Sequence, residues 1–349
     1  MSKEDRISKY LSKANHDMLF GELSDDFLRV MGGLEILKGI PVPISEGENG
    51  RIAVKSIVLD MARVIGGDAS FVYANNYLTY IKAAAGDDAE PILVSEGARC
   101  ADEGKYEEAC MLLRTALMID PESQAAQYLY GRACKACYET AAENAAEGGT
   151  DLGEDYIGSF KAESMDAFEK LTMSHPDFAM GYYFLGYAYL NMGLYLKTKL
   201  TWDDFLKYSS SAGAGDAGMD ENQLEDLRHE ISGMLLDLEE PVKIELGCNK
   251  IMGGDFVGGK DVLMEFTTGR YENWWPLWYY LGVAEASLGN AEEAISDLKR
   301  VLTLSPSNTD VMDELAGLYE AIGDKVNAAK YRQKIEVVNR NSELENTLS

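Results

Sequence analysis

Two cysteines spaced as C-x-x-C are the first residues in this chain whose types and spacing could do chemistry. Cys134 and Cys137 could form a redox pair or supply half of a zinc site. A redox pair would need a helix N-terminus after a strand, and a zinc site would need a second matched pair. The sequence offers neither context, and its total of 5 cysteines is odd, which argues against a secreted disulfide framework. We therefore expect reduced thiols inside helices.

The three histidines do not form a catalytic set. His16, His175 and His229 lie far from any nucleophile motif. His175 directly precedes Pro176, where a side chain that bonds free carbonyls suits the end of a helix. We therefore predict that the protein is not an enzyme.

Two further patterns could indicate ligand sites. Glycine pairs at 253–254 and 258–259 precede Lys260, as in a phosphate-binding loop, but no strand comes before them and no Ser or Thr follows the lysine. The adjacent carboxylates at 203–204 and 239–240 would point in different directions on a helix and make a poor oxygen cage. We expect turn glycines and solvated acids, with no metal and no cofactor.

The balance of charge limits the class of partner. Lys and Arg total 32 against 59 Asp and Glu, so the formal net charge is −27. Such a surface repels nucleic acid and anionic membranes and favours a neutral or basic partner. The chain shows no export signal and no stretch long and uncharged enough to cross a bilayer, so we expect a cytoplasmic protein. The sequence does not set its oligomeric state.

The helices that must position any functional site recur along the chain. Near the C-terminus the step is 34 residues and relates Gly282 to Ala316, and the same step relates Gly97 to Gly131 in the first half. Small residues on facing helices let the two backbones approach closely, while larger neighbours fill the space between successive pairs. The pattern therefore predicts stacked helix pairs.

The repeated motif resembles the tetratricopeptide repeat family. It is clearest in Trp278-x-x-Leu281-Gly282, which is followed at the family's positions by Gly289, Ala294, Leu298 and Pro306. The first helix of another repeat shows the same motif in Tyr182-x-x-Leu185-Gly186-x-x-Tyr189. The resemblance covers residues 90–342 and implies an all-α fold, a right-handed superhelical solenoid of about six helix pairs.

Two departures from the 34-residue step indicate insertions. Gly131 and Gly186 are 55 residues apart, which places 21 extra residues near 143–156, in a glycine-rich and acidic stretch. A second insertion near 209–222 contains a run of Ser, Ala and Gly with almost nothing to bury. Both compositions predict exposed loops.

The first 89 residues match the family poorly, and we expect them to form a helical cap region. Helices are predicted at 5–20, 25–37, 55–65 and 70–84. Short extended segments flank Asn49-Gly50, which predicts a β-hairpin at 40–54. At the other end, residues 343–349 are expected to form a frayed tail.

The family places its partner-binding side chains on the inward face of the first helix of each pair. Carried over to this chain, that pattern implies a partner-binding groove formed by Tyr128, Arg132, Lys135, Met180, Tyr183, Tyr187, Asn191, Tyr279 and Val283. Such a groove would be aromatic with one basic patch, suited to a segment with an apolar anchor and a nearby carboxylate. Tyr183 and Tyr187 could instead be packed beneath an inserted loop.

The resemblance and the lack of a catalytic set favour a non-enzymatic protein–protein interaction scaffold or adaptor that binds a polypeptide segment in its concave groove. The alternative is a peptide- or ligand-responsive regulator in which residues 1–89 act as a helical output module. DNA binding by that module is disfavoured because its basic residues are diluted by Asp25, Asp26, Glu35 and Glu46. A third class, an enzyme with its site in the N-terminal region, has no motif in its support.

Overall fold

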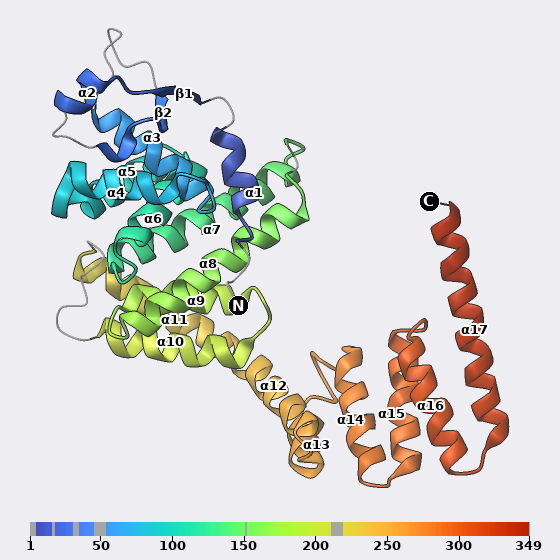
Figure 1. The fold of residues 1–349 in the computed structure, drawn as a ribbon. Coiled ribbons are helices and arrows are strands. Elements are labelled where there is room, and N and C mark those ends of the chain that lie inside the picture. Colours follow the sequence, from blue (N-terminus) through green and yellow to red (C-terminus); the bar gives the residue numbers. More distant parts are fainter. Residues whose placement is uncertain are drawn as a thin grey trace. The chain divides into compact units, whose positions relative to one another are not determined.

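The structure is a computed structural model, and it describes residues 5–15, 18–30, 35–44, 54–150, 152–210 and 219–348. The chain divides into two compact units. Unit 1 comprises Met1–Met192 with Thr201–Arg228, and unit 2 comprises Gly193–Leu200 with His229–Ser349. Both are built almost entirely of helices, as expected for an all-α fold (Figure 1). No helix among the described residues is long and apolar enough to cross a membrane.

Unit 1 begins with short elements and two longer helices. These are α1 (Ser8–Leu11), β1 (Leu19–Glu22), α2 (Asp25–Val30), β2 (Pro41–Ile44), α3 (Val54–Gly67) and α4 (Ala74–Ala85), with 3-10 turns at Ser12–Asn15, Glu35–Leu37 and Gly86–Asp88. The helices expected at 55–65 and 70–84 are confirmed by α3 and α4. The helix expected at 5–20 is wrong over its second half, because the chain leaves the helical conformation and enters β1 at Leu19.

A short antiparallel strand pair is present in this region, but its partners differ from the expected ones. The segment at 41–44 forms β2, which pairs with β1 so that Leu19 lies opposite Ile44 and Glu22 opposite Pro41. Val54, expected in the returning strand, instead begins α3, and residues 45–53 lie outside the described part of the chain. Prolines two apart remove donors from one edge of β2, so that edge cannot extend the sheet.

Helix pairs make up the rest of the chain. The elements are α5 (Ala89–Asp102), α6 (Tyr106–Ile119), α7 (Gln124–Ala146), α8 (Glu154–Ser174), α9 (Ala179–Leu190), α10 (Tyr195–Ser209), α11 (Glu221–Asp237), α12 (Glu239–Met252), α13 (Phe256–Met264), α14 (Trp275–Ser287), α15 (Ala291–Leu304), α16 (Thr309–Ala321) and α17 (Lys325–Leu348). In the described residues they form six pairs, beginning with α5, α7, α9, α12, α14 and α16, while α11 stands outside the pairing.

A glycine on the first helix faces a large side chain on the second helix in five of these pairs. The facing residues are Gly97 and Leu113, Gly131 and Phe168, Gly186 and Trp202, Gly247 and Leu263, and Gly282 and Leu298. A Cβ atom on Gly282 would lie 2.9 Å from Leu298, and one on Gly186 would lie 2.1 Å from the Trp202 indole nitrogen. The partner lies 16 residues downstream except in the second pair, where 21 more residues intervene. This close approach is the packing reason for the repeat.

The insertion in the second pair lengthens both helices instead of forming the long loop expected at 143–156. α7 has 23 residues and α8 has 21, whereas α5 and α6 have 14 each. Only residues 147–153 connect the lengthened helices. Tyr156 and Phe160 in the added turns of α8 are buried and pack against Tyr10, with ring centroids 5.0 and 6.1 Å away. The composition of the insertion could not predict the longer helices, because the apolar residue that covers them lies near the N-terminus.

The second expected insertion, at 209–222, falls mostly outside the described residues, since 211–218 are among those not described. α11 begins at Glu221 and buries Leu224 and Ile231, which lie on one face of the helix. A helix with buried apolar residues two turns apart on one face is amphipathic, as its sequence indicates.

The N-terminal residues and the first repeats share one core in unit 1. The Thr115 hydroxyl of α6 donates to the Ala62 carbonyl of α3 at 2.7 Å, and Gly66 of α3 lies against the Met111 backbone of α6. The first helix pair begins at Ala89, and the first unit extends on both sides of that point.

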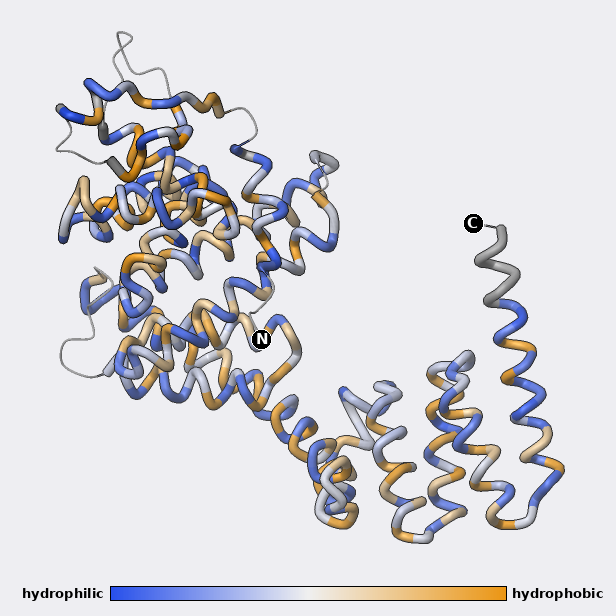
Figure 2. The backbone as a smooth tube through the Cα atoms, in the orientation of Figure 1, coloured by the Kyte–Doolittle hydropathy of each residue, from blue (hydrophilic) through white to orange (hydrophobic). Residues whose placement is uncertain are grey.

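α17 ends the array in unit 2 and is rich in hydrophilic residues (Figure 2). Its Arg332, Lys334, Glu336 and Arg340 are all exposed, as an end cap requires. The helix continues to Leu348, so most of the tail expected at 343–349 is helical.

Candidate functional site

The C-x-x-C cysteines lie in the middle of α7 and are buried. The sulfur of Cys110, on α6, lies 3.6 Å from that of Cys134 and 4.0 Å from that of Cys137, and all three are free thiols. Burial raises the pKa of the Cys110 and Cys134 thiols, so both stay protonated and weakly nucleophilic. The expectation of thiols inside helices is confirmed.

The other patterns considered for chemistry have structural roles. His175 caps the end of α8, and its Nε2 lies 2.7 Å from the Glu122 carbonyl oxygen. Lys260 pairs with Glu285 at 2.6 Å, while Gly259 allows α13 to approach the Gly247 carbonyl of α12. In the part of the chain that the structure describes, no three His, Cys, Asp or Glu side chains are grouped to hold a metal ion.

Aromatic residues expected in the groove of unit 1 form a connected surface on α7 and α9. Tyr183 and Tyr187 lie one turn apart on α9, with ring centroids 5.2 Å apart and planes at 67°. Tyr183 contacts Phe184 edge-on at 5.1 Å, and the Arg132 guanidinium of α7 lies 5.8 Å from the Phe184 ring centre. Arg132 is exposed and the tyrosines are half-buried. We call Arg132, Tyr183, Phe184 and Tyr187 the α7–α9 face.

The second helix of the pair supports this face from behind. Trp202 and Phe205 of α10 are fully buried. The Trp202 ring meets Tyr187 at 5.0 Å, the Phe205 ring meets Tyr183 at 5.5 Å, and the Trp202 indole N–H donates to the Tyr183 carbonyl at 3.2 Å. The two tyrosines are therefore fixed on one side by packing, while each keeps a solvent-accessible part.

Four other residues expected in the groove of unit 1 are placed differently. Tyr128 and Met180 are only 7% and 2% exposed, so their side chains pack within the unit and offer little surface to a partner. Lys135 is paired with Glu139 along the same helix. Asn191 is exposed just after the end of α9. The sequence could not separate these cases, because burial depends on which neighbours cover each position.

Tyr279 and Val283, the remaining expected residues, lie on α14 and so belong to unit 2. The Tyr279 hydroxyl donates to Glu314 at 2.8 Å, and its ring contacts Trp275 and Tyr280. Val283 is half-buried. The structure therefore divides the expected groove residues between the two units.

Sequence reasoning missed a cavity of about 510 Å³ in unit 2, between α12 and α14. Its open walls include Tyr195, Met252, Arg270, Tyr271, Trp274 and Tyr280. We call this cavity the unit 2 pocket. The only available signal was the density of aromatic residues just before α14, in a segment that the repeat pattern treats as a connection.

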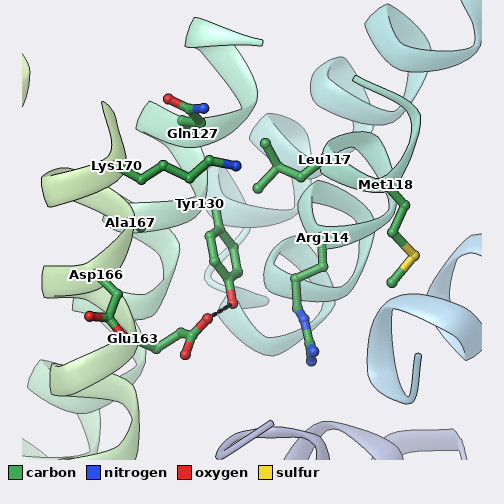
Figure 3. Close-up of a pocket in the computed structure, with 9 residues that line it drawn as sticks. All are labelled: Arg114, Leu117, Met118, Gln127, Tyr130, Glu163, Asp166, Ala167 and Lys170. Carbon is green, nitrogen blue, oxygen red and sulfur yellow. Dashed lines mark hydrogen bonds between the residues drawn. The ribbon is translucent and has the colours of Figure 1, made fainter. Parts of the chain in front are cut away.

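A second missed cavity, of about 390 Å³, lies in unit 1 among α6, α7 and α8 (Figure 3). Its charged groups are already engaged. The Tyr130 hydroxyl donates to Glu163 at 2.9 Å, and Arg114 pairs with Asp5 of the N-terminal segment. The same segment inserts Ile7 into the core, where it is 0% exposed. This cavity therefore borders an internal packing contact.

Comparisons with known proteins give remote likenesses only. No protein-family model matches the chain, and no curated protein matches it. Similar solved structures include MamA from Desulfovibrio magneticus RS-1, at 16% identity over 74% of this chain and 98% of that one, with a TM-score of 0.25. Another is the TPR domain of P58(IPK), at 16% identity over 72% of this chain and 60% of that one, with a TM-score of 0.34. A third is YrrB, described as a TPR protein with an unusual peptide-binding site, at 13% identity over 66% of this chain and 94% of that one, with a TM-score of 0.28.

The fold follows from the chain's own geometry. Its helices are paired, a 34-residue step relates Gly97 to Gly131 and Gly282 to Ala316, and a glycine meets a large side chain inside five of the pairs. The chain has an all-α fold built of tetratricopeptide-like helix pairs.

Proposed function

We propose that the protein is a non-enzymatic interaction scaffold that holds a polypeptide segment of another protein against the α7–α9 face. The observation that supports this proposal is the Tyr183–Tyr187 ring pair, which is half-buried and backed by the buried Trp202. Rings that are already immobilised lose little side-chain entropy when a partner covers them, so such residues often dominate binding energy.

The charges beside the rings set the chemistry of the partner segment. Arg132 lies above the Phe184 and Tyr128 rings at 5.8 and 5.4 Å and stays exposed, so it can meet a carboxylate. The chain as a whole carries a net charge of −27, which favours a partner that is neutral or basic overall. The proposed segment therefore has an apolar anchor for the tyrosines, an acidic group close to it and basic residues further away.

A displayed library of random peptides, selected against the full chain, tests this proposal. The affinity of the selected peptides is then measured for the double variant Tyr183→Ala and Tyr187→Ala. If both rings are hot spots, the loss should be about 2 kcal/mol or more, which corresponds to about 30-fold in Kd.

Two further variants separate binding from folding. Arg132→Gln removes an exposed charge without touching the rings and should weaken peptides that carry an acid. A matched double substitution of exposed apolar residues in unit 2, Ile322→Ala and Val326→Ala, should leave affinity unchanged. Full affinity in a double tyrosine variant with a native circular dichroism spectrum would move the binding site elsewhere, and turnover in hydrolase or transferase screens would contradict the non-enzymatic part.

A further inference from the structure

The unit 2 pocket is an apolar cavity with solvent-accessible walls. Trp274 and Met252 are 39% and 65% exposed at its mouth, while Ile244 and Cys248 are only 4% and 6% exposed and belong to the core beneath it. The Tyr280 hydroxyl lies 3.8 Å from the Met252 sulfur, which holds these two side chains together. A cavity of about 510 Å³ lies in the range of sites that bind a bulky side chain with its flanking backbone.

The pocket owes its aromatic wall to a long connection between two repeats. α13 ends at Met264 and α14 begins at Trp275, whereas only residues 305–308 separate α15 from α16. Gly269, with a φ of 86°, adopts a left-handed conformation within the connection. The longer path places Arg270, Tyr271 and Trp274 beside α12, where an ordinary repeat would have no residues.

The cation at the rim of the pocket is Arg270. The Arg270 guanidinium lies over the Tyr271 ring at 5.5 Å, and among the residues that the structure describes it makes no ion pair. The one carboxylate in the lining, Glu245, accepts a hydrogen bond from the Leu196 backbone N–H at 2.8 Å. In a chain with a net charge of −27, an arginine left unpaired beside an apolar cavity favours an anionic group on whatever enters.

The exposed side chain of Asn249 adds a group that can recognise a backbone. It lies on α12 in the pocket lining, and no hydrogen-bond partner for its amide occurs in the described part of the chain. A side-chain amide both donates and accepts, which matches the N–H and C=O of an extended peptide. Apolar walls, one cation and one amide together match a short segment of polypeptide better than an isolated apolar molecule.

We propose that the unit 2 pocket is a second polypeptide-binding site, which takes one aromatic or large aliphatic side chain whose sequence neighbour is Asp or Glu. The apolar side chain enters between Trp274, Tyr280 and Met252. The adjacent carboxylate pairs with Arg270, and Asn249 bonds the peptide backbone. This site goes beyond the proposed function, because it lies in the other compact unit and uses none of the residues of the α7–α9 face.

The test uses the full chain and a displayed library of random 12-residue peptides. Selected sequences are sorted by their dependence on Trp274→Ala and Met252→Ala, two changes at exposed side chains, and each variant is checked by circular dichroism. One peptide from the dependent set is then synthesised in two forms that differ only by Asp to Asn next to the apolar residue. Binding of both forms is measured to the wild type, to Arg270→Gln and to the control Arg340→Gln, which removes the same charge from an exposed position on α17.

The expected result is a set of peptides that depend on Trp274 and Met252 and are enriched in an apolar residue next to an acid. The acidic form should bind the wild type about tenfold more tightly than the amide form, since a charge-assisted hydrogen bond is worth about that much. The preference should disappear in Arg270→Gln and persist in Arg340→Gln.

Three results would overturn the inference in distinguishable ways. A preference for the acid that survives Arg270→Gln would remove the assigned role of Arg270. Peptides that depend on Tyr183 and Tyr187 but never on Trp274 would leave the proposed function standing and refute the second site. A library from which no peptide is enriched would count against both proposals.

Discussion

Asp297 on α15 is a position where a charge weakens the fold of unit 2. Burial raises its pKa to about 6, and the negative charges of Glu285 on α14 and Glu293 on α15 act in the same direction, while Lys260 on α13 opposes them. Lys260 is itself paired with Glu285 at 2.6 Å, so little of its charge is left for Asp297. We predict that Asp297→Asn, which keeps the shape of the side chain, stabilises the protein at neutral pH.

The magnitude follows from the difference in pKa between the folded and unfolded chains. An Asp pKa raised from 3.8 to about 6 means that the folded state holds its proton more tightly, so the carboxylate destabilises the fold increasingly as pH rises through this window. The full shift corresponds to about 3 kcal/mol above pH 6. Because Asp297 is half-buried and its surroundings can relax, we expect Asp297→Asn to increase the free energy of unfolding by about 1 to 2 kcal/mol at pH 7.5.

Urea denaturation followed by circular dichroism measures the effect at pH 7.5 and at pH 4.5. The stabilisation should fall to about a third at pH 4.5, because the folded Asp297 is then mostly protonated and already neutral. Asp313→Asn, at an exposed position on α16 in the same unit, is the matched control and should change stability little at either pH. An equal gain at both pH values, or a loss at pH 7.5, would refute the reasoning.

Three further predictions concern packing and exposure in unit 1. Gly186→Ala should lower the free energy of unfolding by about 1 to 3 kcal/mol, because the new Cβ atom would meet Trp202. Gly158→Ala, in open space on α8, should instead raise the free energy of unfolding by up to about 1 kcal/mol. Thermal melts that rank the two variants the other way would contradict the glycine contact. Asp5→Asn should cost about 1 to 2 kcal/mol in urea titrations by leaving the mostly buried Arg114 without its carboxylate, and an unchanged midpoint would show that the pair contributes nothing. Limited proteolysis should cut the connection at 147–153 before any site in the preceding turns of α7, and early cleavage within those turns would contradict the helical extension.

The repeat register could be predicted because its cause is local. Gly186, Gly247 and Gly282 each meet a partner 16 residues downstream, so the sequence carries the contact inside each pair at a fixed short spacing. Helix pairs, their number and the positions of Tyr183 and Tyr187 on one helix face all follow from that register. The surface that a partner would meet does not follow from it, since Tyr128 occupies an equivalent position and is buried.

The misplaced loop at 143–156 shows where local composition misleads. Glycines and acids occur there, but α7 continues to Ala146 and α8 begins at Glu154, because Tyr156 and Phe160 find an apolar partner in Tyr10. That partner lies about 150 residues earlier, so no pattern within the insertion could reveal it.

The sequence by itself determined the helix pairs, their order and the close contact within most pairs, because a glycine with a bulky partner at a short, repeated spacing needs only neighbouring helices. Contacts between segments far apart in the chain were decided only by the tertiary structure. β2 pairs with the earlier β1, Tyr10 covers the extended α8, and the connection before α14 places Arg270 and Trp274 at the rim of a cavity against α12. Such contacts depend on which apolar surfaces remain uncovered after the repeats have stacked, and short-range periodicity does not encode that information.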